Sequence, residues 1–424
     1  MSLSRRALLA GSAAMVAGLA ALRPSDKGGH YSDYFRSLNS TLQKAGIDKP
    51  SLIIDLDRLD RNIDRLVASI SEGSHKDYRV VTKSIPSAPL VDYVSKRAGT
   101  QSQMVFHRPF LQAMATQQPQ SNLLLGKPMP IAAAHKFYQE HRGPFDPERQ
   151  LQWLVDTPER MAQYLQLAQD RGERLGINLE LDVGLHRGGF EPDSGLYSAL
   201  RLIADNSDHL ALTGFMGYDA HVSAIPTVLA EREMAKVKQR YAAAVHLLQA
   251  DFPQLYRPDL CFNGAGSPTF RLYDGQEQIN EVAAGSCLVK PTDFDLPILG
   301  DFEAASYIAT PVLKRLIGSK LPALESAGSL IRAWDVNKRQ TYFAYGGKWM
   351  AKVESPPGIT PHFAYVSSNQ QGYNASEKVD IGVDDYLFLR PTQSEAVLLQ
   401  FSDLLAVRNG SIVDRWPVLS ELSA

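Results

Sequence analysis

The sequence predicts an α/β protein, with a (β/α)8 TIM-type barrel followed by a C-terminal antiparallel β domain. Three observations support this fold class. Strand-like and helix-like segments alternate through residues 50–300, which indicates a parallel sheet. Eight such strands fall within about 220 residues, which suits a closed barrel. Beyond residue 302 the helical periodicity largely disappears, and short strand-like runs separated by turns take its place.

Composition limits the classes of protein that the chain can belong to. Of its 424 residues, 44% are hydrophobic and 21% are charged, which is normal for a globular protein with a substantial core. The formal net charge of −2 gives no reason to expect a nucleic-acid partner or a membrane-surface patch. Cys261 and Cys287 are the only cysteines, too few for a disulfide framework or a zinc motif.

The N-terminus has the pattern of an export signal. Arg5 and Arg6 precede an apolar run rich in alanine and glycine that extends to Leu22. The run is short for a membrane span, whereas paired arginines followed by an apolar stretch are typical of twin-arginine signals. We therefore expect residues 1–28 to be a twin-arginine signal and the protein to be periplasmic. A retained signal anchor is the alternative.

The predicted barrel is entered through a strand at Ser51–Asp57, with Asp57 as the N-cap of the helix that follows. A further helix is expected over Tyr31–Ala45. The eight barrel strands are predicted at Tyr78–Ser84, Gln103–Phe106, Asn122–Leu125, Leu151–Asp156, Ile177–Val183, Ala211–Tyr218, Leu260–Asn263 and Glu281–Ala284.

Helices are expected between most of these strands. Thr157–Arg171 has an N-cap threonine, an acidic first turn and an apolar face, and Thr227–Ala250 is the longest helical stretch. We place the barrel at residues 50–300 and the β domain at 302–424, with a possible contribution from residues 29–57.

The C-terminal part is predicted to be mainly strands. Asn409-Gly410 is a strong signal for a type I′ hairpin turn. The expected strands are Tyr307–Leu313, Ser329–Trp334, Gln340–Tyr345, Tyr386–Leu389, Ala396–Gln400, Leu404–Arg408 and Ile412–Val418.

Lys83 is the first candidate for chemistry, since it lies at the carboxyl end of the first predicted barrel strand. Active sites of such barrels are at that end, and a desolvated lysine loses its proton readily and forms Schiff bases with carbonyls. A lysine that only extends from the strand end into solvent is the alternative interpretation.

The loops after the seventh and eighth strands suggest a phosphate site. The first contains Gly264, Gly266, Ser267 and Thr269, and the second contains Gly285 and Ser286. Glycines let backbone amides turn toward an anion, hydroxyls add donors, and these loops are the usual phosphate site of barrels. Two ordinary glycine-containing loops are the alternative.

Charged and aromatic residues end the fifth and sixth strands. Asp182, His186 and Arg187 follow the fifth, and they could equally form local caps and pairs. Tyr218 ends the sixth and could contact a ring nitrogen or simply pack in the core. A lysine, a phosphate site and an aromatic partner at one barrel mouth describe binding of pyridoxal phosphate.

At these residues the chain resembles the fold type III, alanine-racemase-like pyridoxal-phosphate enzymes, and most of all the D-threonine aldolase and D-serine dehydratase family. The similarity covers about residues 48–418. It rests on the entry segment Pro50–Asp57 followed by Leu59 and Asn62, on Arg79-Val80-Val81-Thr82-Lys83-Ser84, on Asp182 to Gly189, which is the most specific match, and on Glu281 with Gly285.

The resemblance implies roles for particular residues. Lys83 is the expected Schiff-base lysine and catalytic base, Arg187 would face the phenolic oxygen of the cofactor, and Tyr218 would face its pyridine nitrogen. The phosphate would be held by Gly264, Gly266, Ser267, Thr269, Gly285 and Ser286. A homodimer and a small amino-acid substrate are also implied. From the net charge of −2 we expect no nucleic-acid partner and, after signal removal, no membrane association.

The sequence departs from that family where a divalent metal is usually bound. Ile85 and Pro86, in place of a histidine, follow Ser84, and Gln393 and Glu395 stand where a His/Cys metal pair is expected. An upstream Glu-His-Gly is replaced by Gln370-Gln371-Gly372. Amide and carboxylate oxygens are poor substitutes for imidazole and thiolate, so we predict no metal site.

Three functions follow as hypotheses. The first is a lyase, an aldolase or ammonia-lyase, that acts on D-amino acids with pyridoxal phosphate. The second is a metal-independent racemase or deaminase on the same fold, suggested by Gln393 and Glu395. The third is a non-catalytic periplasmic binding protein that keeps the fold.

Overall fold

The computed structural model describes residues 23–71, 75–273, 275, 277–318 and 325–419. Most of the predicted export signal (residues 1–22) lies outside this part of the chain. Contact clustering divides the chain into two compact units. Within the described residues, the first comprises 23–53, 307–391 and 409–412, and the second comprises 54–306, 392–408 and 413–419. The domain boundaries predicted from the sequence, 50–300 for the barrel and 302–424 for the β domain, stay predictions.

The second unit is built around a closed parallel barrel, which confirms the predicted fold class. Its strands follow chain order around the ring, and β2 pairs with β9 to close it. The strands are β2 (Asp77–Val81), β3 (Ser102–Val105), β4 (Asn122–Leu125), β5 (Leu151–Val155), β6 (Leu175–Leu181), β7 (Leu210–Gly217), β8 (Cys261–Gly264) and β9 (Glu281–Ala284).

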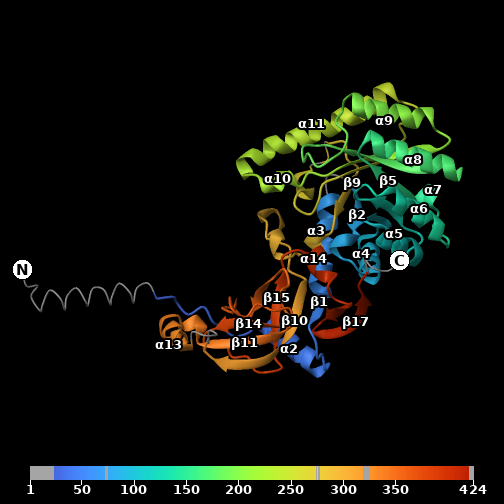
Figure 1. Ribbon diagram of the computed structural model, residues 1–424. Helices are drawn as coiled ribbons and strands as arrows, with labels where there is room; N and C mark the ends of the chain where they lie inside the picture. The colour runs from blue at the N-terminus through green and yellow to red at the C-terminus, as the bar shows by residue number, and fades with distance from the viewer. Residues whose placement is uncertain (1–22, 72–74, 274, 276, 319–324, 420–424) are drawn as a thin grey trace, which may run out of the picture. The chain divides into compact units, whose positions relative to one another are not determined.

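Helices surround the barrel, as Figure 1 shows for α4 to α11. They are α3 (Leu56–Ser71), α4 (Ala88–Ala98), α5 (Arg108–Gln117), α6 (Ile131–Glu140), α7 (Pro147–Gln150), α8 (Pro158–Arg171), α9 (Ser194–Asp205), α10 (His221–Ala224), α11 (Thr227–Asp251), α12 (Ser286–Val289) and α14 (Ser394–Leu398). The side chain of Thr157 caps α8 as predicted, by accepting a hydrogen bond from the backbone N–H of Arg160.

Two local predictions at the ends of strands are wrong. Asp57 is not a cap, because α3 begins at Leu56 and the side chain of Asp55 accepts from the backbone N–H of Arg58. Lys83 is not part of the strand either. β2 ends at Val81, and Thr82–Ser84 form a 3-10 turn that carries Lys83.

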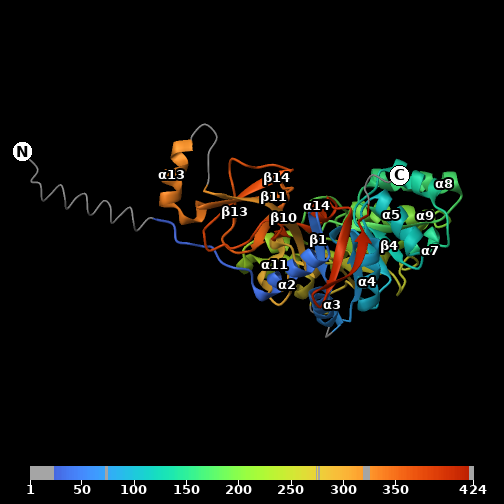
Figure 2. The same ribbon diagram turned by 90° about the horizontal axis from the view of Figure 1, so that it is seen from below.

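The first unit contains an antiparallel sheet, seen in Figure 2 together with α2 (Asp33–Lys44) and α13 (Glu325–Trp334). Its strands run in the order β13-β14-β11-β10-β1, and β15 pairs with both β10 and β12. They are β1 (Ser51–Asp55), β10 (Ser306–Ile317), β11 (Gln340–Tyr345), β12 (Ala351–Ser355), β13 (Thr360–Pro361), β14 (Gln370–Ala375) and β15 (Tyr386–Pro391).

The predicted Asn409-Gly410 hairpin is confirmed between β16 (Asp403–Arg408) and β17 (Ser411–Pro417). Both turn residues have positive φ, 49° and 69°, as a type I′ turn requires. Two predicted strands are wrong: Ser329–Trp334 lies within helix α13, and Ala396–Gln400 overlaps helix α14. In both segments a short apolar run, which fits either state, was assigned to a strand.

Candidate active site

A cavity of about 520 Å³ opens at the carboxyl ends of the barrel strands. Its volume lies within the usual range of small-molecule sites. Of the predicted site residues, Lys83, Arg187, Tyr218, Gly266, Ser267, Gly285 and Ser286 line it. The topology therefore gathers residues that are far apart in the sequence around one space.

Lys83 enters the cavity from the 3-10 turn after β2. Its Nζ lies 4.8 Å from the ring centroid of Phe106 and 3.0 Å from Oε2 of Glu395, which sits in the first turn of α14. Both side chains of this ion pair are about 40% exposed, so we assign it little stability. Its significance is chemical, since it places an amine and a carboxylate together in the cavity.

Hydroxyl and amide groups form a cup at the ends of β8 and β9. The Oγ of Ser267 accepts hydrogen bonds from the backbone N–H groups of Gly285 (3.2 Å) and Cys287 (3.0 Å). The Oγ atoms of Ser84 and Ser286 lie 3.0 Å apart. We call Ser84, Gly266, Ser267, Gly285 and Ser286 the phosphate cup, because turned amides and hydroxyls are the donors that phosphate oxygens need.

The phosphate cup leaves no room for a side chain at its two glycines, Gly266 and Gly285. A Cβ atom on Gly285 would lie 2.8 Å from the carbonyl oxygen of Val81 and 2.9 Å from Cβ of Ser84. A Cβ on Gly266 would lie 2.8 Å from the ring of Tyr218. Glycine is therefore required at both positions by close approach of the neighbouring strand ends.

Two predicted phosphate residues do not line the cavity. Gly264 is the last residue of β8. Thr269 is fully buried, and its hydroxyl donates to the carboxylate of Asp219 at 2.7 Å, as does the hydroxyl of Tyr273. Burial raises the pKa of Asp219, and the bonds from Thr269 and Tyr273 oppose the rise. This buried cluster supports the loop that follows β7.

Arg187 and Tyr218 face each other in the cavity wall, with the guanidinium carbon 5.4 Å from the ring centroid. Burial raises the pKa of the Tyr218 hydroxyl, Asp219 adds to the rise and Arg187 opposes it. The neighbouring Asp182 and His186 do not line the cavity. Asp182 instead accepts from the backbone of Gly184 and from His186, which confirms a local turn.

The cavity also contains residues that the sequence analysis did not assign. Ser84 directly follows Lys83, and Phe106 and Lys127 follow β3 and β4, so the rule that chemistry lies after barrel strands could have found them. Gln393 and Glu395 had been considered only as metal ligands. The unassigned lining residues include Ser84, Met104, Phe106, Gly126, Lys127, Asn263, Phe294, Gln393, Ser394 and Glu395.

Ser394 is a lining residue of the cavity and is 1% exposed. With the amine of Lys83 and the neutral phosphate cup, the residues present fit an aldehyde that carries a phosphate ester.

Among the residues described, no group of three or more His, Cys, Asp and Glu side chains is placed to hold a metal ion. Likewise, no helix in the described ranges is long and apolar enough to cross a membrane.

The closed barrel, the lysine after its first strand and the antiparallel sheet together define the architecture of fold type III pyridoxal-phosphate enzymes. Residues 54–293 match the family model described as "Alanine racemase, N-terminal domain", and the chain belongs to this family. Its members are enzymes that depend on pyridoxal phosphate and act on small amino acids. No curated protein matches the sequence.

Solved structures agree on the fold at low sequence identity. D-threonine aldolase from Filomicrobium marinum is similar with a TM-score of 0.70 and 19% identity, over 88% of this chain and 96% of that one. D-threo-3-hydroxyaspartate dehydratase from Delftia sp. HT23 has a TM-score of 0.68 and 17% sequence identity, over 88% of this chain and 98% of that one. Alanine racemase from Clostridium difficile 630 has a TM-score of 0.64 and 13% sequence identity, over 87% of this chain and 98% of that one.

Proposed function

We propose that the protein is a pyridoxal-phosphate enzyme of the lyase type that acts on D-amino acids, as an aldolase or an ammonia-lyase. The observation that carries the proposal is the position of Lys83 in a cavity that also contains the phosphate cup. When bound, the cofactor supplies an electron sink for charge that develops at the substrate Cα. Similarity to D-threonine aldolase and D-threo-3-hydroxyaspartate dehydratase favours D-amino acids.

The residues of this chain would bind the cofactor and transfer protons. Lys83 would hold the cofactor covalently, and its amine would be the base, for the Cα proton in an ammonia-lyase or for the β-hydroxyl proton when an aldolase breaks the Cα–Cβ bond. Ser267, Ser286 and the backbone of Gly266 and Gly285 would hold the phosphate, while Arg187 and Tyr218 would contact the ring. Glu395, whose carboxylate lies 3.0 Å from Nζ, would pair with the amine of Lys83 and orient it in the cavity.

Replacement of Lys83 by alanine tests this assignment. We expect Lys83→Ala to lose the visible absorbance of covalently held cofactor and to lose activity by a factor of about 1,000 or more, because nucleophile and base are removed together. Borohydride reduction followed by peptide mapping should place the cofactor on Lys83 in the unaltered protein. Covalent cofactor retained in Lys83→Ala would contradict the assignment.

A second candidate function is a racemase or deaminase that needs no metal. It is favoured by Glu395, which gives the cavity a carboxylate as a second proton-transfer group beside Lys83. Conversion of a D-amino acid into its enantiomer that persists unchanged in a chelator supports the racemase. Activity that is lost on chelation and restored by a divalent ion supports a metal-dependent lyase instead.

We further propose that the mature protein is a periplasmic homodimer exported by the twin-arginine route. The paired Arg5 and Arg6 and the apolar run after them support export. Cell fractionation of Arg5→Lys/Arg6→Lys against the unaltered chain tests it, since accumulation in the cytoplasm is expected for the variant. Sedimentation of the purified protein tests the dimer.

A further inference from the structure

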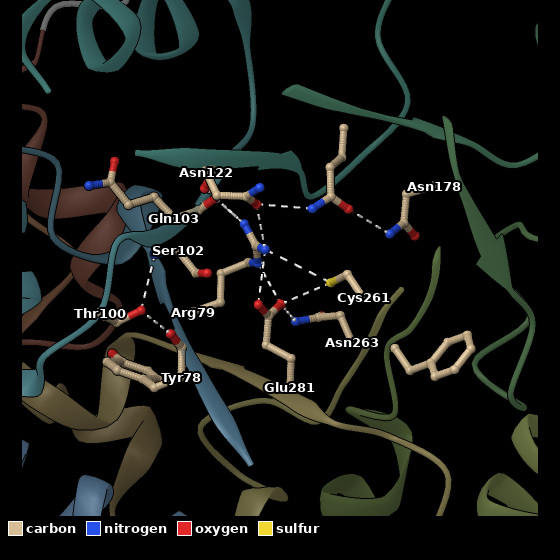
Figure 3. A network of polar contacts seen from close by, with 12 residues as sticks. Tyr78, Arg79, Thr100, Ser102, Gln103, Asn122, Asn178, Cys261, Asn263 and Glu281 are labelled. Carbon is tan, nitrogen blue, oxygen red and sulfur yellow. Dashed lines mark hydrogen bonds and ion pairs between the residues drawn. The ribbon is translucent and has the colours of Figure 1, made fainter. Parts of the chain in front are cut away.

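Beneath the cavity, the barrel interior holds a polar network instead of the branched apolar residues that usually fill it (Figure 3). At its centre is Arg79 of β2, which is 1% exposed and pairs with Glu281 of β9 through two hydrogen bonds of 2.5 and 2.9 Å. The guanidinium also donates to Asn122 of β4, at 2.8 Å to its side chain and 3.0 Å to its backbone oxygen.

The network extends across the interior, since it joins strands that are not neighbours in the ring. Arg79 reaches β4 past β3, and its Nη2 lies 3.8 Å from the sulfur of Cys261 on β8. Asn263 of β8 donates to Glu281 at 2.7 Å and itself lines the cavity. The network therefore forms the floor of the site.

Three members of the network lie four residues before a residue of the site. Arg79 precedes Lys83 by four residues, Glu281 precedes Gly285 by four, and Asn263 precedes Ser267 by four. β2 and β9 are paired in register from Asp77–Glu281 to Val80–Ala284. The ion pair thus joins the strand that delivers Lys83 to the strand that delivers the phosphate cup.

The upper ends of the same two strands are also close. The Ser84 and Ser286 hydroxyls are 3.0 Å apart, and a Cβ on Gly285 would crowd Val81 and Ser84. A small shift of β2 against β9 would move Lys83 relative to the cup. A bond between amine and aldehyde forms only when both are placed to within a fraction of an ångström, and misplacement by about 1 Å can slow such steps about 100-fold.

A buried ion pair adds little net stability, because removing both charges from water costs free energy. Well-packed apolar residues in the same place often give equal or greater stability. Its directional geometry can instead specify one arrangement of the strands that it joins. Burial alone would raise the pKa of Glu281, but Arg79 and hydrogen bonds from Arg79, Cys261 and Asn263 lower it, so the carboxylate stays charged.

We propose that the Arg79–Glu281 pair is a positioning element, which holds Lys83 at the spacing from the phosphate cup that covalent attachment of the cofactor requires. The inference rests on the proposed function. Arg79 and Glu281 do not react themselves, but they set the position of Lys83, which does. Neither residue is among those that line the cavity.

The test separates binding of the phosphate from attachment to Lys83. Pyridoxamine 5′-phosphate carries the phosphate and ring but no aldehyde, so its dissociation constant, measured by calorimetry, reports noncovalent binding of phosphate and ring without attachment to Lys83. The rate at which pyridoxal 5′-phosphate becomes trapped on Lys83 by borohydride, followed by absorbance and peptide mapping, reports the spacing. Thermal unfolding of each apo-protein reports stability.

For Glu281→Gln and Arg79→Lys, we expect the dissociation constant of pyridoxamine phosphate to change less than about twofold and the attachment rate to fall about tenfold or more. The double variant Arg79→Leu/Glu281→Leu removes both charges, avoids an unpaired buried charge, and should show the same separation. The matched control is Glu277→Gln, which breaks the buried ion pair between Lys76 and Glu277 just before β2 and β9. It should alter thermal stability but not the attachment rate.

The outcomes are distinct. Attachment at the unaltered rate in both Glu281→Gln and the double variant overturns the inference. So does a parallel loss of attachment, pyridoxamine phosphate binding and thermal stability, which would indicate a structural role only. If the unaltered protein never attaches the cofactor at Lys83, the proposed function fails and this inference fails with it.

Discussion

At the scale of single residues, the barrel interior holds a carboxyl group with an unusual affinity for protons. Glu180 lies on β6 and is buried. Burial raises its pKa to about 7, Asp156 and Asp182 add to the rise, and Arg187 opposes it. The folded protein therefore binds a proton at Glu180 between pH 4.5, the ordinary value, and pH 7, where the unfolded chain does not.

This difference makes stability depend on pH. Because the pKa of Glu180 is higher in the folded state, its contribution makes the free energy of unfolding fall as pH rises from about 4.5 to about 7. Glu180→Gln removes this pH-dependent contribution. We therefore expect the free energy of unfolding of the variant, relative to that of the unaltered protein, to rise by about 3 kcal/mol between pH 5 and pH 8. Urea unfolding at both pH values measures it.

Glu148→Gln provides the control, because Glu148 is an exposed carboxylate on the short helix α7. A Glu180→Gln difference that is equal at pH 5 and pH 8 would show that the carboxyl is ionised normally and that the burial argument is wrong.

At the scale of elements, α8 shows how local chemistry defines a helix. Thr157 accepts a hydrogen bond from Arg160 at 3.2 Å, and Gly172 ends the helix with a φ of 62°. Thr157→Ala leaves a helix-terminal N–H without this partner. We expect it to lower the free energy of unfolding by about 1 kcal/mol, measured by urea denaturation.

Ser87 is the matched control, since it stands at the same position before α4 but makes no capping bond. Its buried hydroxyl has no partner among the described residues, so Ser87→Ala should be neutral or slightly stabilising. An equal loss in both variants would rule out a specific capping contribution of Thr157.

The elements that were predicted wrongly share one property. Ser329–Trp334 and Ala396–Gln400 are short apolar runs, and such runs fit a strand and a buried helical turn equally well. The barrel strands were easier, because each is a short, largely apolar segment next to segments with helical periodicity. The predicted ends agree with the structure to within one or two residues, except at β2, which ends at Val81 instead of Ser84.

At the scale of the whole molecule, cofactor binding should appear as stability. A ligand that binds only the folded state raises the free energy of unfolding by RT ln(1 + [L]/Kd), which is about 2.7 kcal/mol at 100 times Kd. We therefore expect pyridoxal 5′-phosphate to raise the unfolding temperature in a concentration-dependent way, measured by scanning calorimetry.

Pyridoxal, which lacks the phosphate, should stabilise the protein much less, because it has no group for the hydroxyls of Ser267 and Ser286 to bind. Equal stabilisation by both compounds would contradict the assignment of the phosphate cup.

The local pattern of residues was sufficient to predict the barrel, the segments that form its strands and the position of Lys83 close to the end of the first strand. Such features depend on periodicity and turn chemistry over a few neighbouring residues, which the chain carries in its sequence. The same rule placed Ser267, Gly285 and Ser286 near one another, because loops after neighbouring parallel strands lie at one end of a barrel.

Three features depended on the folded chain. Thr269 supports Asp219 instead of the cavity, Glu395 stands beside Lys83, and Arg79 meets Glu281 across 202 residues of sequence. No local pattern specifies these contacts, because they arise only when the barrel closes and side chains from non-adjacent strands share its interior. The sequence determines which groups are available, and barrel closure determines which of them meet.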